Sequence, residues 1–308
     1  MDASWARLEK GQLASVRAFQ KRELSAARQN NSFVFYPFSG PDVLYATSFF
    51  PDSKLYVLAG LEPVGHMRAP ATYRKEKLDG ELSGWNQALA SILGRSFFVT
   101  SEMDRQFHGR VADGLLPMIL LLLTRSGYDI DGFRYGHLST VGEFVMEPPD
   151  ATGKQKHMGV EIRFRRPSET VSRQMFYFST DLGPAFQRDP DFSRFLTRLG
   201  KAETLVKSCS FLLHWGTCNA IRSHILKTSS LILEDDTGVP FRYLQSSDWR
   251  VELFGEYSAP DRPFKKQYQH DLAAAFAEKT NVKTLGFSLG YGYNRRPSSM
   301  ILARRAAS

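Results

Sequence analysis

Apolar residues near the start of the chain recur with the spacing of a helix. Between residues 4 and 29, large apolar side chains return about every 3.6 positions, as on one face of an amphipathic helix. These side chains are Trp5, Leu8, Leu13, Val16, Phe19 and Leu24. The pattern predicts an N-terminal helix within residues 1–30.

The next stretch, NSFVFYPFSGPDVLYATSFFPDSKLYVLAGLEPVG (residues 31–65), contains two short apolar runs around a turn. Residues 33–38 are typical of a strand, and Ser39-Gly40 interrupts them. Pro41 suits the first position of a helix, because its missing N–H would have no partner there. Residues 55–61 form a continuous apolar run, as in a parallel strand buried on both faces. The stretch therefore predicts a strand–helix–strand unit.

The middle of the chain changes from helical to strand-like patterning. Helical spacing predicts helices at residues 82–98 and 110–125. Short runs typical of strands follow, with polar links between them, at residues 128–138, 142–146, 158–166 and 174–179. We interpret residues 128–180 as a β-rich antiparallel insertion or as an extension of the main sheet. Helical spacing returns at residues 186–199.

A second cycle of strands and helices occupies the last third of the chain. Its predicted elements are a strand at 205–214, a helix at 218–227 with Thr217 as N-cap, a strand at 231–233, a helix at 264–279, and a hairpin with arms at 287–293 and 300–303. Alternating strands and helices favour a sheet covered by helices. We therefore expect one α/β domain over residues 1–308, with a Rossmann-like, mostly parallel sheet and a C-terminal β-hairpin.

Composition agrees with a folded domain and leaves the partner open. The 308 residues are 42% hydrophobic and 23% charged, which is ordinary for a globular protein with a large core. A net charge of +8 permits nucleic acid as a partner, but no nucleic-acid motif accompanies it. We expect a small-molecule ligand. The two cysteines exclude a disulfide scaffold, and no Cys/His pair has zinc spacing.

No segment of the sequence indicates a membrane span or a targeting signal. The longest apolar run, residues 115–123, is far shorter than the roughly 20 residues that a spanning helix needs. The charged N-terminus does not read as a signal peptide. We expect a cytoplasmic protein from the sequence as it stands, and a periplasmic or envelope protein if a signal ahead of Met1 has been removed.

The first strand–helix–strand unit has features of a nucleotide site. In open α/β sheets the ligand lies at the carboxyl ends of the strands, where the first turn needs glycine. A carboxylate roughly 20 residues further on then binds ribose hydroxyls, and Glu62 follows Gly40 at about that spacing. The GxGxxG pattern is absent, and Asp42 would repel a pyrophosphate at the start of the helix. A cofactor without phosphates fits this turn better than NAD or FAD.

The order of elements resembles the class I S-adenosylmethionine-dependent methyltransferase fold. FPDSKLYVLAGLEP is similar to that family's second strand, LVKSCSFLLHWGTCNAIRSHILKTSSLILEDD to its fourth strand, helix and fifth strand, and LGFSLGYGY…MILARR to its closing antiparallel hairpin. The family's glycine-rich loop is reduced here to Ser39-Gly40-Pro41-Asp42. The resemblance implies S-adenosylmethionine as cofactor, held by Glu62 and the Ser39–Asp42 loop, with His214 near the methyl acceptor. FYPFSGPD and GLEPVG also look like an uncharacterised bacterial family.

Two other classes of function compete with a methyltransferase. A degenerate, non-catalytic binding or envelope protein could reuse the same fold. A metal-dependent hydrolase could hold Mg²⁺, Mn²⁺ or Ca²⁺ on Glu234, Asp235 and Asp236, with His214 nearby, because hard cations prefer clustered carboxylates. The same acidic residues also suit an ordinary turn before Gly238.

Two further groups of residues are weaker candidates for a site. Cys218 at a predicted helix start could have a lowered thiol pKa. The segment GYGYNRRP could bind anions through Arg295 and Arg296, or stack bases on Tyr291 and Tyr293. Asn, Arg and Pro are also ordinary residues at a hairpin tip.

Overall fold

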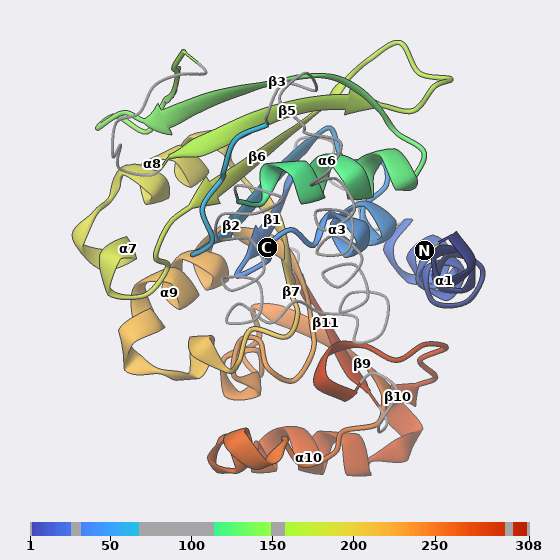
Figure 1. The fold of residues 1–308 in the computed structure, drawn as a ribbon. Helices are drawn as coiled ribbons and strands as arrows, with labels where there is room; N and C mark the ends of the chain where they lie inside the picture. The colour runs from blue at the N-terminus through green and yellow to red at the C-terminus, as the bar shows by residue number, and fades with distance from the viewer. Residues whose placement is uncertain (1, 26–31, 68–113, 149–157, 293–297, 307–308) are drawn as a thin grey trace.

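The fold is a single large sheet with helices on both faces (Figure 1). A computed structural model describes residues 2–25, 32–67, 114–148, 158–292 and 298–306. The helices in this part of the chain are α1 (Asp2–Leu8), α2 (Ala14–Phe19), α3 (Val43–Phe49), α6 (Leu116–Arg125), α7 (Pro184–Arg188), α8 (Asp191–Leu199), α9 (Asn219–Thr228) and α10 (His270–Ala277). Within these described ranges, no helix has the length and apolarity needed to cross a membrane.

The sheet has 11 strands in the order β10-β9-β11-β8-β7-β1-β2-β6-β5-β3-β4. Their bounds are β1 (Phe33–Pro37), β2 (Leu55–Gly60), β3 (Asp129–Leu138), β4 (Phe144–Met146), β5 (Gly159–Arg165), β6 (Arg173–Ser179), β7 (Ala202–Val206), β8 (Ser229–Glu234), β9 (Trp249–Gly255), β10 (Val282–Lys283) and β11 (Ser299–Arg305). The predicted strands at 33–38 and 55–61 correspond to β1 and β2, and the unit that they form with α3 is confirmed.

The centre of the sheet is parallel and its two sides are largely antiparallel. β8, β7, β1, β2 and β6 are neighbours that all run in the same direction. Antiparallel pairing then begins at β11 on one side and at β5 on the other. The predicted α/β class is confirmed, whereas a mostly parallel, Rossmann-like sheet is not, because the sheet as a whole is mixed.

The β-rich middle of the chain contributes to this same sheet. β6 pairs in parallel with β2, so it belongs to the parallel centre. β5, β3 and β4 continue outward from β6 by antiparallel pairing. Residues 158–179 thus connect the parallel centre to one outer edge of the sheet.

The predicted C-terminal hairpin is wrong in one of its arms. β11 is a strand, but its antiparallel neighbours are β8 and β9. Residues 286–292 form bends and a 3₁₀ turn instead of a strand. The Ser298 hydroxyl bonds both the N–H and the C=O of Leu289, and Gly290 has a φ of 62°, so the chain turns where an extended arm was expected.

Both faces of the central parallel strands are buried under helices, which explains the continuous apolar runs in the sequence. Val34 and Tyr36 of β1 face the N-terminal helices, α3 and α6, whereas Phe33 and Phe35 face α8 and α9. In Figure 1, α3 and α6 lie on one side of the central strands and α7, α8 and α9 on the other. This arrangement leaves the strand ends as the place where a ligand could reach the sheet.

Several helix predictions need adjustment. The 4–29 helix is present through residue 25 and includes two π-helical stretches, Glu9–Leu13 and Gln20–Leu24. Helix 186–199 is split into α7 and α8. The 264–279 helix is a 3₁₀ segment, Arg262–Gln267, followed by α10. Residues 82–98, for which a helix was predicted, lie outside the described part of the chain.

Candidate functional site

A cavity of 610 Å³ lies at the carboxyl ends of the central parallel strands. The loops after β1, β2, β6 and β7 all contribute to its lining. From β1, the chain proceeds to β2 and β6 on one side of the sheet and to β7 and β8 on the other. Two adjacent loops that leave in opposite directions open a crevice, and open α/β sheets bind their ligands there.

The loop after β1 and the end of β2 meet inside this cavity. The Ser39 N–H donates to the Ala59 carbonyl (3.0 Å), which holds the loop against β2. Glu62 lines the cavity with only 9% of its surface exposed. The Tyr177 hydroxyl donates to the backbone carbonyl of Glu62 (2.8 Å). A Cβ on Gly60 would lie 2.5 Å from Glu62 Oε2 and 3.4 Å from the Gly40 N atom. Glycine at position 60 therefore leaves room for the Glu62 carboxylate beside Gly40.

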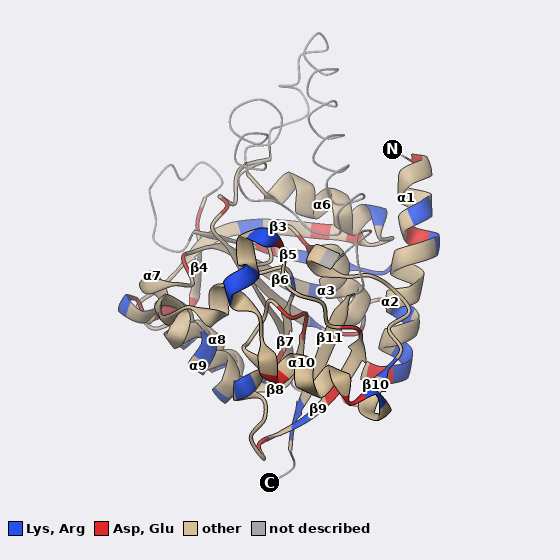
Figure 2. Cartoon of the chain, turned by 90° about the horizontal axis from the view of Figure 1, so that it is seen from below, with Lys and Arg blue, Asp and Glu red and all other residues tan. Residues whose placement is uncertain are grey.

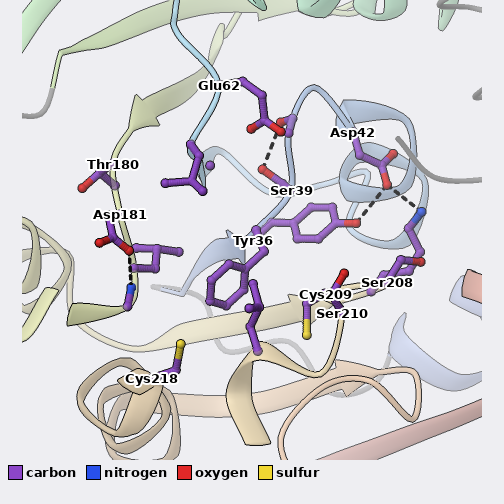
Figure 3. Close-up of a pocket in the computed structure, with 18 of the residues that line it drawn as sticks. Tyr36, Ser39, Asp42, Glu62, Thr180, Asp181, Ser208, Cys209, Ser210 and Cys218 are labelled. Atoms are coloured by element: carbon purple, nitrogen blue, oxygen red, sulfur yellow. Dashed lines mark hydrogen bonds and ion pairs between the residues drawn. The ribbon is translucent and has the colours of Figure 1, made fainter. Parts of the chain in front are cut away.

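Asp42 carries out structural roles as well as lining the cavity. Its Oδ1 accepts from the Tyr45 N–H (3.3 Å), so Asp42 is the N-cap of α3. Its Oδ2 accepts from the Tyr36 hydroxyl (2.9 Å) and pairs with Lys207 Nζ at 2.8 Å (Figure 3). Pro41 lies ahead of the helix, which begins at Val43. The ion pair joins the loops after β1 and β7.

The backbone of these two loops is strained. Among the described residues, the non-glycine residues with positive φ are Phe38 (57°), Ser208 (53°), Ser210 (54°) and Phe211 (56°). Phe38 follows β1, and the other three follow β7. Such conformations cost about 1–3 kcal/mol each, persist where surrounding structure enforces them, and cluster at functional sites. Ser208, Ser210 and Phe38 also line the cavity.

The end of β6 supplies a further wall. The Thr180 N–H donates to the Gly60 carbonyl (2.7 Å), so this loop is held beside β2. Asp181 lines the cavity, and its Oδ1 accepts from the Gly183 N–H (2.7 Å). Figure 3 shows Thr180 and Asp181 across the cavity from Ser208 and Ser210. The site is thus enclosed by loops from four strands.

The lining is acidic although the chain as a whole is basic. Asp42, Glu62 and Asp181 contribute three carboxylates and Lys207 one ammonium, for a formal charge of −2 among the described lining residues. Elsewhere Lys and Arg are interspersed with Asp and Glu over the ribbon (Figure 2). Because Lys207 is already paired with Asp42, the cavity offers a poor environment for phosphate and a better one for a cationic group.

Both cysteines line this cavity. They are free thiols, and Cys209 Sγ donates to the Thr237 carbonyl (2.8 Å). Burial raises the pKa of the Cys218 thiol, with a smaller opposing effect from its hydrogen bond to Thr217. The lowered pKa that Cys218 could have had at a helix start is therefore not found. A 3₁₀ turn, Gly216–Cys218, precedes α9, and Thr217 does not cap the helix.

His214 does not lie where a strand at 205–214 would have placed it. β7 ends at Val206, and His214 belongs to a 3₁₀ turn, Leu212–His214, outside the cavity lining. Its ring packs edge-on against Phe211 at 5.1 Å, and its Nε2 is buried with no hydrogen-bond partner in the described structure. Burial, aided by Arg242 and Arg222, lowers the pKa of His214 to about 4. The structure therefore gives no support to His214 near an acceptor.

The acidic loop 234–236 is used mainly to hold its own backbone. Asp235 accepts from the Ser208 N–H (2.8 Å) through Oδ2, and from the Thr237 N–H (3.0 Å) through Oδ1. Glu234 Oε2 accepts from the Val239 N–H (2.8 Å), and burial raises the pKa of Glu234 well above its usual range. Within the described ranges, no group of three His, Cys, Asp or Glu side chains is arranged to hold a metal ion. The metal site on Glu234, Asp235 and Asp236 stays a prediction.

Several lining residues were missed from sequence. Asp181 follows a strand that the sequence places in a β-rich insertion or sheet extension, so its loop is not among the expected ends of parallel strands. Lys207 was placed inside a long apolar strand, where a lysine is itself a signal of a special environment. Phe264 reaches the cavity from a distant segment, and so does Tyr291, which the sequence offered only as a candidate for stacking bases. The predicted anion-binding residues Arg295 and Arg296, and Tyr293, lie outside the described part of the chain.

Comparison of the chain with protein-family models, with curated proteins and with solved structures found no match. The geometry and charge of the cavity are therefore the basis for assigning a function.

Proposed function

We propose that the cavity binds S-adenosylmethionine or a closely related nucleoside, and that the protein is a methyltransferase of the class I type. The observation that carries this proposal is the position of Glu62. Its carboxylate lies in the crevice where the strand order reverses, at the end of β2 and beside the Gly40 loop. In nucleotide-binding α/β sheets, a carboxylate at this position accepts hydrogen bonds from ribose hydroxyls.

The order of the parallel strands supports the proposal. Counted along the chain, β6-β2-β1-β7-β8 reads 3-2-1-4-5, which is the order of the first five strands in the doubly wound nucleotide-binding fold. β11 then enters antiparallel beside β8, as the closing strand of a class I methyltransferase would. The outer strands β5, β3 and β4 extend this arrangement without interrupting it.

The charge of the lining favours this cofactor over a phosphate-bearing one. S-adenosylmethionine carries a sulfonium and an ammonium against a single carboxylate, so it is a net cation, and it has no phosphate. A cavity with a formal charge of −2 attracts such a ligand and repels the pyrophosphate of NAD or FAD. The single glycine turn at Gly40 also leaves less room for a pyrophosphate than GxGxxG does.

The chain's own residues would bind and orient the reactants. Glu62 would hold the ribose, the Ser39–Asp42 loop and Asp181 would line the remainder of the nucleoside site, and the Lys207–Asp42 pair would keep the two central loops in place. When bound, the cofactor supplies an electrophilic methyl group. Orienting donor and acceptor in line accounts for much of the catalysis of such a transfer, so a strong acid–base pair is not required.

Calorimetric titration with S-adenosylmethionine and S-adenosylhomocysteine tests the proposal. We expect binding by the unchanged protein, and an affinity reduced roughly 10- to 150-fold in Glu62→Ala, because a hydrogen bond to a charged group is worth about 1.5–3 kcal/mol. Glu62→Gln retains one acceptor oxygen, so its affinity should lie between those of the unchanged protein and Glu62→Ala.

Glu143→Ala provides the control, since Glu143 is an exposed glutamate outside the cavity, 55% exposed and paired with Arg198. Its affinity should equal that of the unchanged protein. Absence of binding to either ligand would refute the proposal and would favour a non-catalytic binding protein that reuses the fold.

A further inference from the structure

One end of the cavity is lined by aromatic rings. Phe264 stacks on Tyr291 with centroids 5.5 Å apart, and it packs on Phe211 at 5.2 Å. Phe264 stays half-buried between these neighbours and, with Tyr291, lines the cavity. Leu212 also lines this end, and 37% of its surface is exposed. Such a surface suits a flat, apolar ring, because aromatic pairs prefer stacked or edge-on contact.

A hydroxyl without a partner lies beside these rings. The Tyr291 hydroxyl donates to the Ser208 carbonyl (3.0 Å), so the Ser210 hydroxyl is the donor in its 2.8 Å contact with Tyr291. The Ser208 Oγ is buried and has no hydrogen-bond partner among the described residues, although Ser208 lines the cavity. A buried polar atom left unpaired costs free energy, and a bound ligand that donates to it recovers that cost.

The electrostatics of this end disfavour an anionic ligand. Among the described lining residues the cation is Lys207, and it is paired with Asp42. The Asp235 carboxylate lies close by and accepts a hydrogen bond from the Ser208 N–H. Burial, reinforced by Cys209 and Asp235, raises the pKa of the Tyr291 phenol. The carboxylates of Asp42, Glu62 and Asp181 in the same lining disfavour the phenolate that a phenol must form before it reacts, whereas a neutral amine can react without losing a proton first.

We infer that the Phe264–Tyr291 end of the cavity binds a small aromatic amine as the methyl acceptor, with the amine N–H donating to Ser208 Oγ. The inference rests on the proposed function for the transfer itself, but the aromatic site can be tested without the cofactor. It excludes phosphate-bearing acceptors, nucleic acid among them, because they would bring further negative charge into an acidic cavity.

Charge and electrons balance in such a transfer without a general base. The nitrogen lone pair forms the new bond to the methyl carbon, while the bond between that carbon and sulfur breaks and its electron pair stays on sulfur. Positive charge passes from sulfur to nitrogen, and the N-methylated product loses its proton to water after it leaves. The acidic lining stabilises positive charge at both positions.

Three probes with one ring system separate the possibilities: 1-naphthylamine, 1-naphthol and 1-naphthyl phosphate. Their binding to the full chain is measured by calorimetry, with and without S-adenosylhomocysteine. We expect the amine and the naphthol to bind, and the phosphate to bind at least about tenfold more weakly because of charge repulsion. With S-adenosylmethionine present, mass spectrometry should find a methyl group on the amine alone.

Variants of the aromatic wall locate the bound ring. Phe264→Ala should weaken naphthylamine binding roughly three- to tenfold through loss of stacking. Ser208→Ala should weaken binding of the amine about fivefold and leave the affinity for naphthyl phosphate unchanged. Tyr268→Ala is the matched control, because Tyr268 is an exposed ring outside this cavity, and binding should not change.

The outcomes separate this inference from the proposed function. If S-adenosylmethionine binds but naphthylamine does not, or if Phe264→Ala binds it unchanged, the acceptor assignment is overturned and the cofactor proposal stands. If naphthylamine binds at Phe264 but S-adenosylmethionine does not, the aromatic amine site is supported and the methyltransferase is refuted.

Discussion

Lys207 shows how one buried charge can organise the candidate site. Its side chain is 1% exposed, pairs with Asp42 at 2.8 Å, and lies 4.1 Å from the centre of the Tyr45 ring. A buried ammonium is costly unless such partners compensate for lost hydration. Lys207 therefore links the loop after β7 to the start of α3, and it leaves the other carboxylates in the lining to face a ligand.

Removal of this charge should be strongly destabilising. Lys207→Met leaves the Asp42 carboxylate buried without its cation, and we expect a loss of about 3–5 kcal/mol in the free energy of unfolding. Urea denaturation measures the change. Adding Asp42→Asn should restore most of the loss, because asparagine can still cap α3 and the buried charge is gone.

Lys283→Met provides a comparison for the same measurement. Lys283 is 48% exposed in its pairs with Glu23 and Glu252, so its replacement should cost less than about 1 kcal/mol. Equal effects of the two lysine variants would show that burial of Lys207 is not the source of its contribution.

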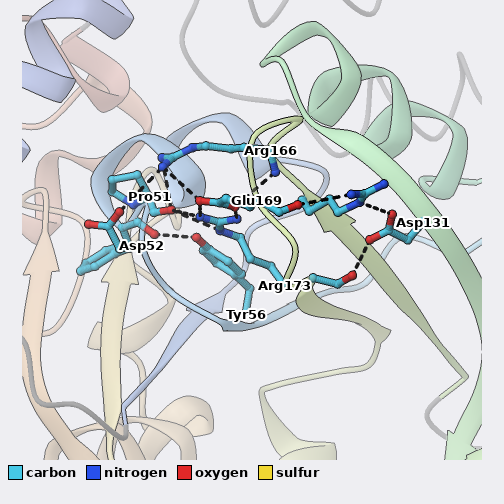
Figure 4. Close-up of polar contacts among 10 residues, drawn as sticks. Pro51, Asp52, Tyr56, Asp131, Arg166, Glu169 and Arg173 are labelled. Atoms are coloured by element: carbon cyan, nitrogen blue, oxygen red, sulfur yellow. Dashed lines mark hydrogen bonds and ion pairs between the residues drawn. The ribbon is translucent and has the colours of Figure 1, made fainter.

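At the scale of elements, a polar network joins two turns at the amino ends of β2 and β6, opposite the cavity. Arg173, the first residue of β6, donates from Nη2 to Glu169 Oε1 (2.9 Å) and to the Pro51 carbonyl (3.2 Å). Arg166 also donates to the Pro51 carbonyl (3.4 Å) and pairs with Glu169 (Figure 4). These hydrogen bonds connect the turn before β2 to the turn before β6, and they help to keep the two parallel strands in register.

This network predicts a loss of stability in acid. The hydrogen bonds from Arg173 lower the pKa of Glu169 to about 2 from an ordinary value of 4.5. A lowered pKa in the folded state means that the contribution is present above about pH 4.5 and disappears as the pH falls toward 2. Because Glu169 is partly exposed, we expect about 1 kcal/mol.

Glu169→Gln should remove this component of the pH dependence. Urea denaturation between pH 2 and pH 7 should give a shallower acid limb for the variant than for the unchanged protein. Glu143→Gln, in an exposed pair with Arg198, should leave the acid limb as it is. Identical limbs for Glu169→Gln and the unchanged protein would contradict the role of the network.

At the scale of the whole molecule, the sheet has a well-covered centre and short edges. β1 and β7 are flanked by parallel strands and buried by helices on both faces, whereas β10 and β4 are edge strands of two and three residues. Backbone hydrogen bonds at a short edge open with little loss of packing, but those at the centre open only when much of the molecule unfolds.

Hydrogen exchange read out by mass spectrometry should follow this order. We expect the slowest exchange in β1, β2 and β7 and the fastest in β4 and β10. A bound nucleoside should slow exchange further in the loops at 38–42, 60–62 and 207–212 and leave β10 unaffected. Exchange in β1 as fast as in β10 would contradict the strand order.

Local patterns identified some elements well and missed others. The apolar run at 55–61 and the aromatic run at 33–38 correspond to β2 and β1. Such runs are easy to recognise in a sequence, because a strand that is buried on both faces is apolar at consecutive positions. The sequence patterns predict neither β9 nor β10, and they predict a strand at 287–293 that is absent from the described residues there. There the side chain of Ser298 and the backbone of Gly290 decide the conformation through contacts that no local pattern reveals.

The sequence by itself determined the α/β class, the strand–helix–strand unit around Gly40, and Glu62 as a candidate ligand-binding carboxylate. These features depend on residues close together in the chain. Only the tertiary structure brought Asp181, Lys207, Phe264 and Tyr291 into the same cavity, and only it placed His214 outside the lining. The physical reason is strand order: the loops become neighbours through pairing between strands far apart in sequence, which local periodicity does not encode.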